Sequence, residues 1–517
     1  MSHAGRRDRR QGGGTGALGR HIRRTGAIPL RTGAGARRRR QSGKPGHGAG
    51  EGGPMRLTEA LLRHARTLRY EDLAPEAVAA TRTFAMDSLA VGLSGSGPQV
   101  PLTATVRQSI AAYGSGQGAR AWVTGQMLPA ASAAMLNGYQ IHNQEFDCVH
   151  MPAVVHPMAV IMASLVAAAE RRGNIEGQAS DGRALIAALN VAVDVATLLG
   201  ICARSPMRFF RPAMCGALGA ALGIAHLHGA DETLQRRMLG LTYSHLSGTM
   251  QAHVEGSPAL ALQVALNARA VLSCWELARN GFPAPREVLE GPFGYLPLIE
   301  GGFDTGPALR SLAAHQAQIL DVSHKAFPTG GAAHAAQDML MELRQRHALG
   351  LDEVSAIELQ APPLVRRLVG RPYMAGMETS YARLCLPFLL GTVLLDGRVG
   401  LSAYTADRLA DPRLAAFAAR VTLVPNDCED PNALVPQSLV LTLRDGRVLR
   451  AHRDAAIGSP QRPLSREQQL EKFHHCLDHA ARPFDAARRA ALISHFDQLQ
   501  DIDDVRRLVD LLIVETP

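Results

Sequence analysis

From Met55 onward the apolar positions recur with the period of a helix. Leu57, Ala60, Leu61, Ala65 and Leu68 keep the three- and four-residue spacing of one helix face. The same spacing predicts further helices, examples being residues 76–91, 130–143, 158–170 and 259–280. Small residues gather between Gly216 and Gly223, where they let neighbouring helices approach closely. The pattern therefore predicts a crowded helical region that extends to about residue 319.

The pattern changes after about residue 320. Short apolar runs bounded by turn residues predict strands at 354–359, 420–424, 438–443 and 447–452. Asp445-Gly446, between the last two runs, is a strong hairpin signal. Helical patterns intervene at residues 331–347 and 380–395, and they return after Ser459.

We therefore expect a mainly α protein, with a large all-helical domain and an inserted smaller α+β domain. Residues 55–319 and 459–517 form the helical domain in this interpretation, and residues 320–458 form the inserted domain.

Composition supports a helical core. The 517 residues are 46% hydrophobic but only 4% aromatic, so the core must consist mostly of Ala, Leu and Val. No membrane span is predicted. The apolar run from Met158 to Ala169 is too short, and charged residues follow it directly.

Most of the net charge lies in the first 54 residues. They hold 13 Lys and Arg side chains but only Asp8 and Glu51 as acids, so they carry +11 while the whole chain carries +9. This Gly- and Arg-rich segment is predicted to be disordered. It fits a nucleic-acid arm, an organelle transit peptide or translation that starts at Met55, and the helical pattern that begins at once favours the last. The remainder carries −2, so its charge gives no case for nucleic-acid binding.

The seven cysteines follow no ligand pattern. None forms a CxxC pair, so there is no obvious set for a zinc ribbon or an iron–sulfur cluster. An odd, scattered number without a signal peptide indicates a reducing compartment, and we expect a cytoplasmic protein.

The segment NGYQIHNQEFDCVHMPAVVHP (137–157) concentrates acids and imidazoles. Glu145, Asp147, His150 and His156 lie within twelve residues, and two prolines predict a loop after about Asp147. Such groups on one loop orient each other and transfer protons. Loop capping by Asp147 and core packing of His156 are the alternatives that composition alone favours. A metal site also stays open, although the spacing fits no standard motif.

Two further segments carry candidate cations. Lys325 precedes a predicted helix near Gly331, where the cation, the helix N-terminus and a Gly-Gly turn would hold a carboxylate. Arg211, before the small-residue helix, would clamp a carboxylate in bidentate fashion. The alternatives are a solvated lysine at a domain junction and a surface salt bridge of the arginine.

Four segments, taken in order, resemble the MmgE/PrpD family, which includes 2-methylcitrate dehydratase, cis-aconitate decarboxylase and iminodisuccinate epimerase. The segments are LRYEDLAPEAVAATRTFAMDSLAVGLSG (68–95), residues 137–157, SHKAFPTGGAAH (323–334) and YARLCLPFLLGTVLLDGRVGLSAYT (381–405). Each motif is modest alone, but all four in the right order are specific. The similarity covers essentially Met55 to the C-terminus.

The resemblance implies a helical domain with an α+β lid, usually as a homodimer, and an active site between the two without metal, nucleotide or cluster. Family positions match at Asp147, His156, Lys325 and His334, and Glu145 stands where many members have Asp. The candidate substrate-binding residues are Glu145, His150, Arg211, His324, His334 and Gln263.

Three positions depart from the family pattern. Arg211-Pro212 stands where His-Pro is frequent, and Phe388 stands where Tyr is common, although Tyr381 lies nearby. Residues 256–263 lack the Lys that the dehydratase and decarboxylase members carry.

The function predicted from these residues is a cofactor-independent lyase of the dehydratase or decarboxylase type, acting on a small polycarboxylate. His156 is the candidate base, oriented by Asp147, and it takes a proton from a carbon next to a carboxylate. Lys325 and Arg211 are candidates for holding carboxylate and enolate oxygens. The alternatives are an isomerase or epimerase of a dicarboxylate and a non-catalytic ligand-binding member. We expect no membrane partner and no nucleic-acid partner for the folded body.

Overall fold

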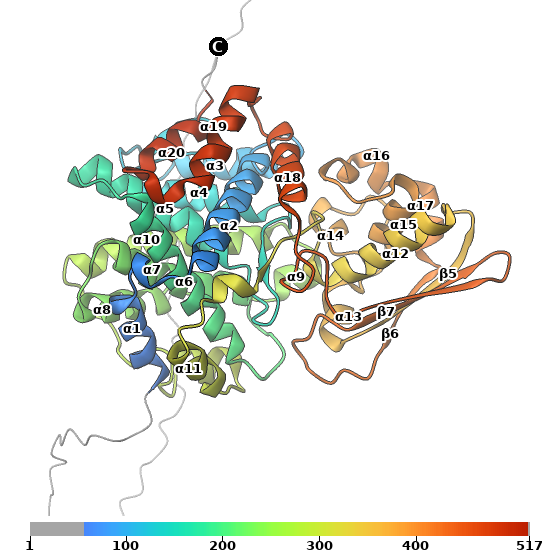
Figure 1. The fold of residues 1–517 in the computed structure, drawn as a ribbon, viewed down its shortest axis with the longest axis horizontal. Coiled ribbons are helices and arrows are strands. Elements are labelled where there is room, and N and C mark those ends of the chain that lie inside the picture. Colours follow the sequence, from blue (N-terminus) through green and yellow to red (C-terminus); the bar gives the residue numbers. More distant parts are fainter. Residues whose placement is uncertain (1–55, 515–517) are drawn as a thin grey trace, which may run out of the picture. The chain divides into compact units, whose positions relative to one another are not determined.

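The computed structural model describes residues 56–514. The expectations for residues 1–54, and the proposed start at Met55, lie outside the described residues. The described chain is mainly helical, as predicted, and residues 56–514 belong to one compact unit (Figure 1). The division into a helical domain and a lid stays a prediction.

The helices predicted at 76–91, 130–143, 158–170 and 259–280 are confirmed, although the third extends six residues further than predicted. The helices of the first part are α1 (Leu57–Thr67), α2 (Pro75–Ser94), α3 (Leu102–Ala111), α4 (Ala130–His142), α5 (Pro157–Glu176), α6 (Gly182–Ile201), α7 (Arg211–Leu227), α8 (Glu232–Tyr243), α9 (Gln251–Glu255), α10 (Ala259–Arg279) and α11 (Gly306–Ala313). The C-terminal helices α18 (Arg466–Asp478), α19 (Ala486–Asp497) and α20 (Val505–Leu512) pack back on them, α18 and α19 against α2 and α20 against α5.

Small residues set the spacing of the central helices. An added Cβ at Gly219 of α7 would lie 2.3 Å from the carbonyl oxygen of Ala192 in α6, so the two backbones touch where no side chain fits. Helices α4, α5 and α10 also pack against one another, α7 packs against α5 and α10, and all four are buried over most of their length. The Ala- and Gly-rich composition is therefore what permits this dense core.

Helix α6 is long and apolar enough to cross a membrane by length and composition, which the sequence analysis did not anticipate. However, 89% of its apolar stretch is buried inside the fold, where it packs against α5 and α7. We interpret it as a core helix.

A four-stranded sheet follows the first helical part. Its strands are β5 (Val354–Ala361), β6 (Val421–Pro425), β7 (Gln437–Leu443) and β8 (Val448–Arg453), in the order β6-β5-β7-β8. Strands β5 and β6 are parallel, the other pairs are antiparallel, and the predicted Asp445-Gly446 turn joins β7 to β8. The helices of this part are α12 (His334–His347), α13 (Pro363–Val369), α14 (Thr379–Ala382), α15 (Leu386–Asp396), α16 (Ala406–Leu409) and α17 (Pro412–Ala418).

One helix predicted in this part is interrupted in the structure. Residues 380–395 do not form a single helix, because α14 ends at Ala382 and α15 begins at Leu386. Pro387 occupies the first turn of α15, where its missing N–H costs nothing. Arg383 lies in the break between the two helices.

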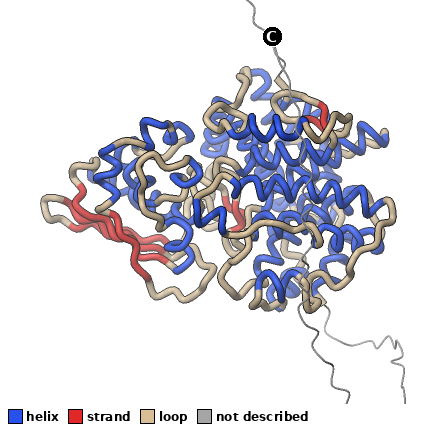
Figure 2. The backbone as a smooth tube through the Cα atoms, turned by 180° about the vertical axis from the view of Figure 1, so that it is seen from behind, coloured by secondary structure: helices blue, strands red, loops and turns tan. Residues whose placement is uncertain are grey.

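The helical part is not purely helical. Two short antiparallel pairs interrupt it: β1 (Ala119–Arg120) with β2 (Met127–Leu128), and β3 (Val149–His150) with β4 (Val322–Ser323) (Figure 2). The second pair matters for function. It joins the loop after α4 to the segment that carries Lys325.

The close approach of α6 and α7 makes Gly219→Ala a sharp test of the packing. We expect this change to lower the free energy of unfolding by about 1–3 kcal/mol, because the new methyl group overlaps the backbone of α6. Gly138→Ala in α4 is the matched control. Its Cβ would meet its nearest neighbour at 3.4 Å, an ordinary contact, so it should be neutral or slightly stabilising. Urea and thermal unfolding measure both, and equal effects would contradict the packing argument.

Candidate functional site

The loop between α4 and α5 holds the candidate residues in fixed positions. His142 is the last residue of α4, and His156 is the residue directly before Pro157, where α5 begins. Glu145 takes a left-handed backbone conformation with φ of 52°, which turns the chain sharply after α4. Two buried helices therefore anchor both ends of the loop that carries Glu145 and Asp147.

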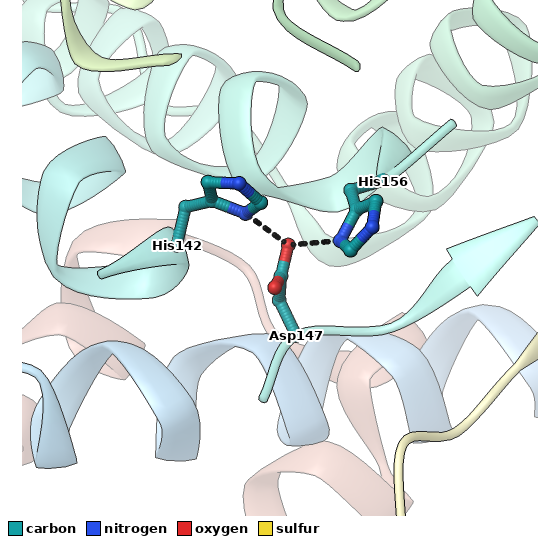
Figure 3. A group of neighbouring side chains, drawn as sticks. All are labelled: His142, Asp147 and His156. Atoms are coloured by element: carbon teal, nitrogen blue, oxygen red, sulfur yellow. Dashed lines mark hydrogen bonds and ion pairs between the residues drawn. The ribbon is translucent and has the colours of Figure 1, made fainter. Parts of the chain in front are cut away.

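Asp147 bridges two imidazoles (Figure 3). Its Oδ2 accepts hydrogen bonds from Nδ1 of His142 at 3.0 Å and from Nδ1 of His156 at 3.1 Å. The two rings meet edge to face, with their centroids 5.0 Å apart. Because an ionised carboxylate only accepts, both Nδ1 atoms carry protons, and each Nε2 is the position left for chemistry.

The electrostatic surroundings shift the pKa values of the two imidazoles in opposite directions. Burial disfavours protonation of His142, but the carboxylate of Asp147 outweighs it and raises the pKa of His142 above 6.5. Burial and then the charge of Lys325 lower the pKa of His156 below 6.5. Burial acts to raise the pKa of Asp147, yet the two imidazoles hold it well below 3.8. Paired groups with opposite shifts are the usual basis of an acid and a base in one site.

Lys325 lies beside this cluster, as the resemblance to the family implied. Its Nζ donates to Oε2 of Glu145 at 2.8 Å and to the carbonyl oxygen of Glu145 at 3.1 Å. It also lies 3.9 Å from Oδ1 of Asp147, and its side chain is fully buried. Burial acts to raise the pKa of Glu145, but Lys325 dominates and lowers it to about 2. The pairing of β3 with β4 is what brings these two distant segments together.

Two neighbouring pockets share Glu145, Leu260 and Leu384. The first, which we call the imidazole pocket, has an empty volume of about 440 Å³ including its opening to solvent. It is lined by His156 and His253, among other residues. The second, the arginine pocket, has about 410 Å³ and is lined by His142 and Arg383, among others. His156 and His142 therefore face different pockets, with Glu145 at the wall of both.

Three predicted histidines lie behind the site and line neither pocket. His334 is fully buried against Phe327, and burial with the nearby Lys325 lowers its pKa to about 3. His324 stacks on Phe84, and burial lowers its pKa to about 4. Both imidazoles are therefore neutral packing groups in this structure.

The third of these histidines, His150, makes a hydrogen bond within the loop between α4 and α5. Its Nδ1 accepts a hydrogen bond from the backbone N–H of Ala153 at 3.2 Å, and burial lowers its pKa to about 4. Substrate contact was expected of all three histidines, and this geometry does not provide it.

Arg211 is a bidentate clamp, but for a carboxylate of the protein itself. Its Nε and Nη2 each donate to Glu300 at 2.9 Å, and both side chains are buried. It is neither a surface ion pair nor a residue that lines the pockets. Gln263 donates to the carbonyl oxygen of Thr249 and also lines neither pocket.

The sequence analysis missed four residues of the site: His142, His253, Arg383 and Lys472. His142 and Arg383 lie inside segments that had been singled out. A histidine one helical turn before an acid-rich loop was the available signal for His142. Lys472 of α18 had no local signal. It pairs with Asp87 at 2.7 Å and donates to the carbonyl oxygen of Phe146 at 2.9 Å, so it holds the loop from the C-terminal helices.

A metal site was the alternative for this loop. His142, Asp147 and His156 offer ligand atoms within 4.8 Å of one another, which is close enough to hold an ion. Three of these atoms lie at hydrogen-bond distances, so Oδ2 of Asp147 and both Nδ1 atoms are paired with one another. We therefore describe the cluster as an acid–base network.

Comparison with known proteins assigns the family. The MmgE/PrpD N-terminal domain matches residues 59–308, and the MmgE/PrpD C-terminal domain matches residues 327–498. The chain belongs to the MmgE/PrpD family. Similar members include cis-aconitate decarboxylases of Homo sapiens and Mus musculus, 26% and 25% identical. The human alignment covers 89% of this chain and 95% of the relative, and the mouse alignment covers 88% and 93%. The enzyme of the same name from Aspergillus terreus is 20% identical over 88% of this chain and 96% of the relative.

In this MmgE/PrpD protein, Asp147→Asn tests the bridge between the two imidazoles. The variant removes the charge that raises the pKa of His142, so that pKa should fall below its wild-type value. Histidine-selective labelling and an NMR pH titration of the His142 ring measure the change. An unchanged His142 titration would contradict the bridge.

The same variant should be less stable by about 3–5 kcal/mol, because it breaks a buried charge pair. The depressed pKa of Asp147 stabilises the fold above its unfolded value of about 3.9, and this contribution is lost as pH falls through the folded pKa. The raised pKa of His142 stabilises the fold below about 6.5, and this contribution is lost as pH rises through the folded value. The difference from wild type in urea unfolding should thus be largest between about pH 4 and 6.5.

Proposed function

We propose that this chain is a lyase that acts on a small polycarboxylate through the acid–base pair His142 and His156. The observation that carries the proposal is the carboxylate of Asp147 between two imidazoles whose pKa values shift in opposite directions. The relatives support the class of reaction and substrate, because they are named cis-aconitate decarboxylases.

Each imidazole has a defined role in this scheme. His156, with its lowered pKa and its Nδ1–H held by Asp147, presents an unprotonated Nε2 as the base. His142, with its raised pKa, is the acid. In a dehydration His156 takes the proton next to a carboxylate, and His142 protonates the departing hydroxyl group as water. In a decarboxylation the C–C bond breaks first, carbon dioxide leaves, and His142 protonates the resulting carbanion.

Lys325 has an electrostatic role here. It is fully buried and paired to Glu145, so it balances the carboxylate that faces both pockets. Without this cation, an ionised Glu145 would repel an anionic substrate. The proton transfers in this scheme all use side chains of the chain itself.

A second candidate is an epimerase of a dicarboxylate. Two imidazoles that face different pockets are suited to remove a proton on one side and return it on the other. Deuterium exchange into substrate without loss of carbon dioxide or water would favour this alternative.

His142→Gln and His156→Gln test the roles, with cis-aconitate as the first substrate and hydroxy-polycarboxylates next. We expect His142→Gln to lower kcat about 10²- to 10⁴-fold for either lyase reaction. His156→Gln should match that loss for a dehydration and affect a decarboxylation less. His64→Gln is the matched control, because it removes another His–Asp pair, with Asp194, from the helical core. Full turnover by His142→Gln would contradict the assigned acid.

The pH dependence of kcat/KM follows from the same pKa shifts. Activity should be lost as pH rises through the raised pKa of His142, because the acid is then deprotonated. For a dehydration it should also be lost as pH falls through the lowered pKa of His156. Asp147→Asn should move the alkaline limb to lower pH, since it removes the charge that raises the pKa of His142. An alkaline limb at the same pH in this variant would argue against His142 as the acid.

A further inference from the structure

Arg383 is a buried cation with unused donors. It lies between α14 and α15 and is only 2% exposed. Its Nη1 donates to the carbonyl oxygen of Asn143, at the C-terminal end of α4. Its Nε and Nη2 are both buried and have no hydrogen-bond partner among residues 56–514. Two unpaired donors on a buried cation are costly, and native proteins rarely leave them without a purpose.

The position of the guanidinium is rigidly set. It lies over the ring of Tyr404 at 4.8 Å, and the Tyr404 hydroxyl donates to the carbonyl oxygen of Pro328. The backbone carbonyl of Arg383 accepts from Gly330 at 3.0 Å, so the residue is also tied to the Gly-Gly turn beyond Lys325. A group held in this way binds a ligand at little further entropic cost.

Arg211 is a buried arginine of the same fold whose corresponding donors do have hydrogen-bond partners. Its Nε and Nη2, the same two atoms, are filled by the carboxylate of Glu300. At Arg383 no carboxylate fills these two atoms, and the residue lines the arginine pocket together with His142 and Tyr139. Burial raises the pKa of Tyr139 to about 12, so its hydroxyl stays protonated beside the guanidinium.

We propose that Arg383 binds a carboxylate of the substrate through Nε and Nη2. The proposal rests on the proposed function, and it specifies how the polycarboxylate is anchored in the arginine pocket. Planar bidentate pairing with a carboxylate is the interaction that these two parallel N–H groups favour. A carboxylate held there places the neighbouring carbon in the pocket that His142 also lines, which is where the acid must deliver its proton.

Calorimetric binding of propane-1,2,3-tricarboxylate, which has neither double bond nor hydroxyl group to react, tests this assignment. Arg383→Gln should weaken its binding about ten- to a hundredfold, the usual loss for hydrogen bonds to a charged group. Arg383→Lys keeps the charge but not the planar edge, so its affinity should lie in between. Arg344→Gln is the matched control. Arg344 lies on α12, donates to the carbonyl oxygen of Leu394 and lines neither pocket, so its affinity should equal that of wild type.

A second ligand identifies which carboxylate of the tricarboxylate Arg383 binds. Propane-1,3-dicarboxylate lacks the central carboxylate, and the affinity ratio of the two ligands should be smaller in Arg383→Gln than in wild type if Arg383 binds that group. If Arg383 binds a terminal carboxylate, Arg383→Gln should weaken both ligands equally. Folded Arg383→Gln and Arg383→Lys proteins, checked by circular dichroism, that bind both ligands as wild type does would overturn the assignment of Arg383 alone. A wild-type protein that binds neither these ligands nor cis-aconitate would overturn the proposed function, and this inference with it.

Discussion

The site depends on keeping several charges inside the protein at once. Asp147 and Lys325 are fully buried and Glu145 is 14% exposed, and an isolated ion in the buried positions would cost several kcal/mol. The cost is tolerable because the charges alternate. Lys325 lies between the two carboxylates, and both imidazoles bond to Oδ2 of Asp147. Removing one member leaves the others uncompensated, so the cluster behaves as one unit.

Three features of the fold hold this cluster in position. The pairing of β3 with β4 joins the loop to the segment of Lys325, and α5 fixes His156 at its first turn. Lys472, from the C-terminal helices, holds the carbonyl oxygen of Phe146, which lies between the two acidic residues in the chain. Elements far apart in the sequence therefore converge on one short loop.

Periodicity predicted the helices and the four main strands, because burial on one face leaves a regular trace in the sequence. The association of Asp147, His156 and Lys325 was expected from the resemblance to the family, which implies that all three belong to one active site. The partners of Arg211 and Lys472 were not predictable in the same way. Glu300 is 89 positions from Arg211, and no local spacing indicates such a contact. The break before α15 could have been predicted from Pro387, which is poorly tolerated inside a helix.

The departures from the family pattern acquire a physical interpretation in this structure. The segment 256–263, which lacks the lysine carried by dehydratase and decarboxylase members, lines the arginine pocket through Gly256, Ser257 and Leu260, among others. A cation from that segment would have faced the pocket in which Arg383 has two unused donors. An anionic substrate needs a positive charge in that pocket, but electrostatics does not require a particular strand or helix to supply it. The charge has an alternative source in Arg383, which comes from the break between α14 and α15. With Arg383 in the role proposed above, the absence of the lysine is compatible with binding of a polycarboxylate.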